Sequence, residues 1–332
     1  MSTRLSYLDL GKGLAIVLVV LGHIYAENPI KIWLYSFHLP LFFFISGCLL
    51  TLGTTRSIKT VIQNRLKSLM LPYALFSFVL FSLWAIKEFR KVSLETVIMK
   101  IINILSLQGI EALWFLPCLF ISEILFLIII RNIKSKTIIF LILLVFSVIP
   151  FVAKDYYNFK LFMRVFIATA FLGIGYYTFS YIKSRSFNIL VPISLLAINI
   201  ILGACNGLVD LYSLQLGNYI LYFASAVSGI LSILLFFKYI GNIKAISFLG
   251  VNSLIIMCTH IQLIAVVTKV ISIIVSVPSS NLMANPYSGL LILGIVLLLE
   301  IPVIYIFNNY LSFFLGKREK CVSQKNVVSA TE

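Results

Sequence analysis

The stretch "KGLAIVLVVLGHIYAENPIKIWLYSFHLPLFFFISG", residues 12–47, decides the fold class of this chain. Its background of Leu, Ile, Val and Phe is typical of membrane-spanning helices, yet it also carries Lys12, His23 and His38. Ionisable groups are costly in hydrocarbon, and those found inside membrane spans usually face a cavity and serve a function. These three residues are therefore the first candidates for a functional site.

The rest of the chain has the same membrane character. Of its 332 residues, 61% are hydrophobic and 11% are charged, whereas soluble domains carry about 25% charged residues. A helix crosses the hydrocarbon core with about 20 apolar residues. Runs of this kind lie near 8–27, 31–53, 68–87, 112–131, 136–153, 161–182, 187–204, 217–240, 246–276 and 287–315. We expect an all-α polytopic membrane protein with about ten transmembrane helices in residues 1–315, followed by a short polar tail, 316–332.

The distribution of basic residues predicts the orientation. Of the 26 Lys and Arg residues, 17 fall on the side that holds the N-terminus if the spans alternate in direction. The positive-inside rule then places both termini in the cytoplasm. The net charge of +15 has the same origin, because basic loops contact anionic headgroups, and it does not indicate a nucleic-acid partner. The five Cys residues show no paired metal spacing, so we expect no metal site.

Helical geometry groups the polar residues of the first span on one face. Lys12 and His23 are eleven residues apart, which is about three turns of helix and about 16 Å of rise. Asp9 lies three residues before Lys12, close enough to pair with it. One stripe thus carries a charge pair near the cytoplasmic side and an imidazole toward the outer half.

The three histidines of the chain fall in one membrane layer. His38 opens the second span from the outside, and His260 lies about fourteen residues into a span that starts inside. His23 and His38 are expected to face one cavity, because a short connection makes the first two spans antiparallel neighbours. An imidazole titrates near neutral pH and suits general-base chemistry. The alternative is structural, because a membrane histidine can simply hydrogen-bond a neighbouring helix.

Other polar residues have plain structural explanations. Arg65 and Lys67 lie in an inner loop, where topology alone would place them. Glu123 and Glu300 lie within spans and are expected to hydrogen-bond a neighbouring helix. Trp114 can be an interfacial aromatic residue. The external segment 88–111 has apolar residues at helical spacing and predicts a helix along the outer interface.

Two motifs near the N-terminus carry a family resemblance. "YLDLGKGLAIVLVVLGHI" (7–24) and "FHLPLFFFISG" (37–47) resemble the opening of the membrane acyltransferase 3 family, in the branch similar to fucose 4-O-acetylases. That family has an Arg or Lys, ten intervening residues and a catalytic histidine, which Lys12 and His23 match. His38 matches the histidine of the second motif.

Later segments extend the resemblance in the expected order. "NRLKSLMLPY" (64–73) is similar to a basic run that contains Arg65, and "ALWFLPCLF" (112–120) is similar to an element that contains Trp114. "FLGIGYYTF" (171–179) resembles a glycine-bearing span of the family. "SLIIMCTHIQLI" (253–264) matches a late histidine element at His260.

The resemblance implies an O-acyltransferase of the bacterial inner membrane. It would move an acyl group, usually acetyl from acetyl-CoA, to a hydroxyl of a surface glycan or of an undecaprenyl-linked sugar precursor. His23 and His38 are the expected catalytic residues, and Lys12 and Arg65 are expected to hold coenzyme A or to support the oxyanion. Asp9, Trp114 and His260 are assigned to substrate binding. The hydrolase-like domain of some members is not expected here, so the membrane core would act alone or with a partner.

Two other classes of function remain open at this stage. Buried ionisable residues also mark transport pathways, so a transporter or flippase of a glycan or lipid-linked sugar is the main alternative. The inverted repeats of many transporters are not evident in the sequence. A structural assembly subunit is the third possibility. The sequence contains no phosphate-binding Gly-rich loop, which argues against an ATP-driven mechanism.

Overall fold

A computed structural model describes residues 5–53, 57–88, 92–153 and 160–316. Over these ranges the chain is helical, and its only strand-like feature is an isolated antiparallel bridge between Asp210 and Gln215. The polar tail lies outside the described residues from position 317 onward. The prediction of an all-α polytopic membrane protein is confirmed.

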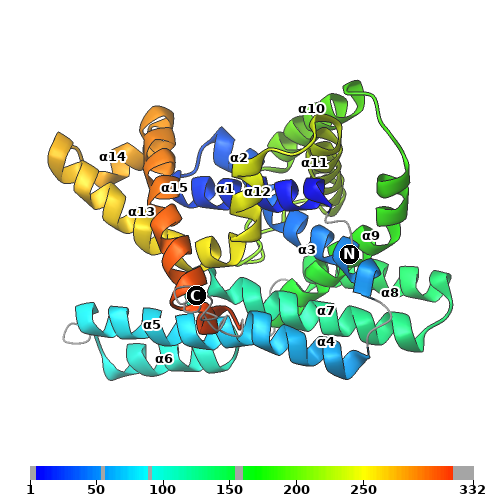
Figure 1. The fold of residues 1–332 in the computed structure, drawn as a ribbon, viewed down its shortest axis with the longest axis horizontal. Helices are drawn as coiled ribbons and strands as arrows, with labels where there is room; N and C mark the ends of the chain where they lie inside the picture. Colours follow the sequence, from blue (N-terminus) through cyan, green and yellow to red (C-terminus); the bar gives the residue numbers. More distant parts are fainter. Residues whose placement is uncertain (1–4, 54–56, 89–91, 154–159, 317–332) are drawn as a thin grey trace, which may run out of the picture.

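Figure 1 shows the order and arrangement of the helices. The N-terminal half contains α1 (Ser6–Ile24), α2 (Pro29–Tyr35), α3 (His38–Leu50), η1 (Thr51–Gly53), α4 (Ile58–Arg65), η2 (Leu66–Met70), α5 (Leu71–Glu88), α6 (Leu94–Leu105), η4 (Glu111–Trp114), α7 (Phe115–Asn132) and α8 (Lys136–Val152). The C-terminal half contains α9 (Lys160–Ser184), α10 (Leu190–Asn206), α11 (Tyr219–Ile240), α12 (Lys244–Val251), α13 (Ser253–Val275), α14 (Ser279–Ala284), α15 (Pro286–Asn309) and η6 (Ser312–Leu315).

The ten predicted spans correspond to ten apolar helical segments among the described residues. Eight of them are long enough to cross a membrane, and α8 and α10 are shorter apolar helices of 17 residues each. These two shorter helices are the fifth and seventh predicted spans. The apolar runs of the sequence therefore predict the positions of these ten helical segments correctly.

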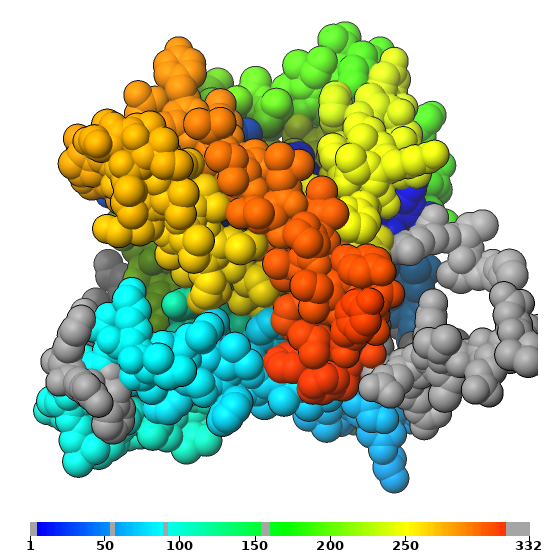
Figure 2. Space-filling view, turned by 60° about the vertical axis from the view of Figure 1, so that its left-hand side comes forward, coloured from blue at the N-terminus to red at the C-terminus, as the bar shows by residue number. Residues whose placement is uncertain are grey.

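Helix α1 occupies the centre of the bundle. It packs against α3, α11, α12, α13 and α15, and most of its residues are buried. On the face shown in Figure 2, it is visible only as small dark-blue patches beside the yellow-to-orange C-terminal helices. Because lipid cannot reach most of α1, its polar side chains face protein and internal cavities instead of hydrocarbon.

Two motif glycines bring α3 and α9 into close backbone contact. A Cβ atom on Gly47 would collide with the carbonyl oxygen of Leu172, and one on Gly175 would collide with that of Phe44. Helices in membranes associate through small residues that let their backbones approach. Gly47 and Gly175 therefore allow α3 to pack closely against α9. Helix α3 begins at His38, so this packing also fixes the position of His38.

The region before the third span differs from the predicted inner loop. Arg65 ends α4, and the chain continues through a π-helical turn, η2, directly into α5. In this turn the N–H of Leu71 donates to the carbonyl of Leu66, five residues back. The wider turn accommodates Pro72, which lacks an N–H and would break a regular helix. Arg65 and Lys67 are thus held on a helix, and this rigid setting was not foreseen.

The predicted external helix is present as α6, and it runs back along α5. Tyr73 Oη donates to the carbonyl of Ile104 at 2.7 Å, and Lys100 Nζ lies 4.6 Å from the ring centre of Trp84. The prediction of a helix is confirmed. Its predicted position at the membrane interface stays a prediction.

Candidate functional site

One cavity lies beside the first half of α1 and is lined by cationic side chains. Its volume is about 200 Å³, and Lys12, Arg65 and Glu123 line it together with Ser46 and Ser68. These residues come from α1, α4, α7, α3 and η2. Two cations converge on a small internal space, which is an arrangement suited to an anionic ligand. We call it the cationic cavity.

Arg65 is anchored in this cavity by a buried carboxylate. Its Nε lies 2.6 Å from Oε2 of Glu123, whose side chain is 0% exposed, while the Arg65 side chain is 31% exposed. Glu123 therefore contacts a neighbouring helix, as expected, and its partner there is a cation. A buried ion pair is costly to form, and this one lies in the cavity wall. Glu300 hydrogen-bonds a neighbouring helix as predicted, because the Thr259 hydroxyl of α13 donates to its carboxylate.

A second, smaller cavity lies beside the end of α1. It measures about 50 Å³, and His23, His38, Tyr35, Trp114 and Asp210 are among its lining residues. His23 is exposed although its neighbours on α1 are buried, so its ring opens onto this space. The expectation that His23 and His38 face one cavity is confirmed. We call it the histidine cavity.

Backbone carbonyls fix the protons on two of the imidazoles. His38 Nδ1 lies 2.6 Å from the carbonyl oxygen of Leu34, and His260 Nδ1 lies 2.8 Å from that of Ile256. A carbonyl can only accept, so Nδ1 carries the proton in both rings, and in the neutral form Nε2 keeps its lone pair. His260 Nε2 is buried and has no hydrogen-bond partner among the described residues, and the His260 ring centre lies 5.1 Å from that of His23.

The loop between α10 and α11 covers the histidine cavity. The backbones of Asp210 and Gln215 exchange two hydrogen bonds, and the Asp210 carboxylate accepts from Tyr212 N at 2.9 Å and from Ser213 Oγ at 2.7 Å. Both Asp210 and Tyr212 line the cavity. A tight turn outside the transmembrane helices therefore contributes one part of the polar wall, and the histidines of α1 and α3 contribute another.

Arg164 locks this loop onto the bundle. Its side chain is 2% exposed, and its Nε and Nη2 donate to the carbonyl of Tyr212 at 2.9 and 2.5 Å. Its guanidinium also lies 4.3 Å from the ring centre of Tyr212 and 5.2 Å from that of Trp114. Such stacking contributes about 2 kcal/mol when the cation is desolvated. Trp114 is thus a buried residue of the cavity wall, and its alternative assignment as an interfacial aromatic is wrong.

Five of the seven predicted site residues line one of the two cavities, and Asp9 and His260 line neither. Lys12 and Arg65 line the cationic cavity, and Trp114 joins His23 and His38 in the histidine cavity. His260 contacts His23 by its ring. Asp9 lies in the first turn of α1, where α12 packs closely against its backbone, and it is not among the residues that line either cavity. Its pairing with Lys12 stays a prediction.

The two cavities adjoin each other. Phe115, the first residue of α7, and Met257 of α13 line both of them. Lys12 and His23, one in each cavity, are separated by about three turns of α1, or about 16 Å along the axis. The cationic cavity and the histidine cavity therefore lie one after the other along α1.

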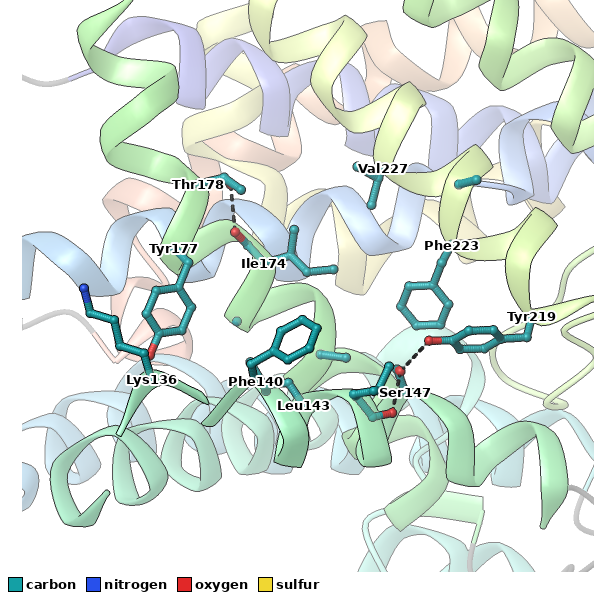
Figure 3. A pocket seen from close by; sticks show the side chains of 14 residues that line it. Lys136, Phe140, Leu143, Ser147, Ile174, Tyr177, Thr178, Tyr219, Phe223 and Val227 are labelled. Carbon is teal, nitrogen blue, oxygen red and sulfur yellow. Dashed lines mark hydrogen bonds between the residues drawn. The ribbon is translucent and has the colours of Figure 1, made fainter. Parts of the chain in front are cut away.

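A third cavity, larger than these two, has a different character. It measures about 640 Å³ and lies between α8, α9 and α11. Figure 3 shows its wall of aromatic and aliphatic side chains, with Lys136 at one end and a 2.9 Å hydrogen bond between Ser147 and Tyr219. Its few polar groups do not converge on one point, so it lacks the features of a reaction site.

Comparison with known families identifies the class. The described helices form a multi-pass membrane protein with a polar site inside its bundle, and a family model described as an acyltransferase domain matches residues 5–314. The protein is therefore a membrane acyltransferase. It belongs to the acyltransferase 3 family. Searches of curated proteins and of solved structures returned no match.

Proposed function

We propose that the protein is an O-acetyltransferase of the bacterial inner membrane. It would transfer acetyl from acetyl-CoA to a sugar hydroxyl of a surface polysaccharide or of its lipid-linked precursor. The observation that carries this proposal is the adjoining pair of cavities along α1, one with two cations and the other with histidines. A transfer reaction needs such a pair, because an anionic donor and a hydroxylic acceptor must meet at a base.

The cationic cavity would hold the donor. Lys12 and Arg65 line one space and can neutralise the phosphates of coenzyme A through charge-assisted hydrogen bonds. Glu123 holds Arg65 by its Nε, so the two terminal guanidinium nitrogens of Arg65 would donate to a phosphate. With α1 beginning in the cytoplasm, as the basic residues favour, this cavity lies on the side where acetyl-CoA is made.

The histidine cavity would hold the base and receive the reacting hydroxyl of the acceptor. His23 takes the proton from the sugar hydroxyl as its oxygen attacks the thioester carbonyl carbon. The new C–O bond forms, the C–S bond breaks, and the departing thiolate of coenzyme A receives that proton from His23. The products are an ester and free coenzyme A, so atoms and charge balance. A positioned base of this kind contributes about 10²- to 10⁴-fold in rate.

Neighbouring residues would orient the acceptor and the base. His38 presents Nε2 because its Nδ1 is engaged by a carbonyl, and His260 supports the His23 ring from the adjacent helix. Trp114 and Asp210 offer an aromatic face and a carboxylate in one wall. This combination suits a sugar, because hydroxyl groups donate to carboxylates.

The test is the ester content of the surface glycan of producing cells, measured by mass spectrometry. We expect His23→Ala to remove the ester while the glycan is still exported, at matched membrane abundance of the protein. Ser213→Ala serves as a matched control on the covering loop and should keep the ester. Unchanged acetylation in His23→Ala would remove His23 from the chemistry. Loss of the exported glycan itself would favour the transporter alternative.

A further inference from the structure

The wall between the two cavities consists of one aromatic and one thioether side chain. Phe115 and Met257 line both spaces, and each is only 4% exposed. Phe115 opens α7 directly after Trp114, and Met257 precedes His260 by about one helical turn on α13. These two side chains are therefore common to the linings of both cavities.

The two side chains differ in how firmly they are held. The Phe115 ring stacks on Phe43 with 5.0 Å between ring centres and meets Phe42 edge-on at 5.6 Å. Aromatic pairs of this kind favour fixed relative geometries. Met257 is unbranched, with three rotatable bonds and a polarisable sulfur, and such side chains adapt to irregular gaps. Phe115 is thus the fixed side of the wall, and Met257 is the side that can move.

The proposed reaction requires passage through this wall. A donor held by Lys12 and Arg65 is anchored about three helical turns from His23. Its carbonyl carbon must nevertheless come within about 3–3.5 Å of the oxygen that His23 deprotonates. The histidine cavity measures only about 50 Å³, so it has room for a few water-sized groups.

We infer that Met257 and Phe115 form a gate between donor and acceptor, and that Met257 limits the acyl group to a short chain. This inference rests on the proposed function. The gate takes no part in bond making or breaking, because its side chains carry no proton donor or nucleophile. It admits the thioester end of the donor, excludes longer acyl groups by size, and separates the two cavities when no donor is bound.

The experiment compares acyl-chain selectivity in membranes that contain the full-length protein and its native acceptor. Acetyl-, propionyl- and butyryl-CoA are supplied singly to wild type, Met257→Ala and Met163→Ala, and glycan esters are counted by mass spectrometry. Met163 is a matched control, because it is also buried but does not appear in the wall of either cavity. We expect Met257→Ala to raise the butyryl-to-acetyl ratio about 10-fold or more, the scale of discrimination by methylene groups in a pocket. Met163→Ala should keep the wild-type ratio.

A second variant keeps the inference open to refutation if Met257→Ala does not accumulate. Met257→Phe narrows the passage, so it should slow transfer of butyryl more than transfer of acetyl. An unchanged ratio in both folded variants would overturn the gate while leaving acetyl transfer intact. Absence of transfer from every acyl-CoA in the wild type would overturn the proposed function, and the gate with it.

Discussion

The apolar cleft and the two polar cavities of this protein differ in both size and chemistry. The cleft between α8, α9 and α11 encloses about 640 Å³ and is almost wholly apolar, whereas the cationic and histidine cavities measure about 200 and 50 Å³. An apolar cleft in a membrane protein costs little, because hydrocarbon can fill it. Buried charges and imidazoles in hydrocarbon are costly, so their convergence marks the site better than volume does.

The largest effect should come from the imidazole that opens onto the histidine cavity. His23→Ala removes the proposed base, so we expect the initial rate of acetyl transfer to fall about 10²- to 10⁴-fold at unchanged protein abundance. His260→Ala should cost less, because His260 contacts His23 only by its ring. The rate loss in each of the two variants is measured from initial rates of acetyl transfer with saturating acetyl-CoA. An equal loss in the two variants would contradict the distinction between base and support.

The ion pair in the cationic cavity gives the next largest effect, on stability. Arg65→Met leaves the wholly buried Glu123 carboxylate without its ion-pair partner, at a cost of about 3–5 kcal/mol. Glu123→Gln leaves only the partly exposed guanidinium and should cost less. Thermal unfolding in detergent should therefore rank wild type above Glu123→Gln and Glu123→Gln above Arg65→Met. The reverse order of the two variants would show that Glu123 is not held as a carboxylate.

A smaller and more selective effect is expected at the covering loop. Asp210→Asn retains the loop shape but weakens a charge-assisted hydrogen bond to the acceptor, so KM for the acceptor should rise about 10-fold. KM for acetyl-CoA should not change, because Asp210 lines only the histidine cavity of the two. Ser213→Ala, which removes one loop hydrogen bond to Asp210, controls for loop stability. A rise in both KM values would assign Asp210 a purely structural role.

The smallest effect should come from the apolar cleft between α8, α9 and α11. Phe140 lines the apolar cleft and is 63% exposed. Phe140→Ala should leave the rate of acetyl transfer within about twofold of wild type, because a lipid tail can replace the ring at little cost. A large loss of activity at normal protein abundance would show that the cleft takes part in the reaction, and the site would then not be confined to the two polar cavities.

The sequence predicts those features that depend on local composition. The ten spans follow from apolar runs, and the shared cavity of His23 and His38 follows from helical spacing and a short connection. The partner of Arg65 could not be found in this way, because the contact with Glu123 depends on how α4 packs against α7. A carboxylate inside an apolar span was the available signal for it.

The covering loop escaped prediction for a different reason. Asp210 lies in an ordinary polar connection, and no local pattern marks it as part of the site. Its position depends on Arg164 and on the rings of Trp114 and Tyr212, which lie beside the guanidinium. Met257 was equally hidden, since a methionine in an apolar span has no distinguishing context.

The most direct test of the central claim uses inside-out membrane vesicles from producing cells, with labelled acetyl-CoA added to the exposed cytoplasmic face and no ion gradient. We predict that vesicles with the wild-type protein place labelled ester on the glycan and release free coenzyme A in equal amount. Vesicles with His23→Ala should do neither. If vesicles with His23→Ala labelled the glycan at the wild-type rate, His23 would not be the base that acts on a donor held in the cationic cavity.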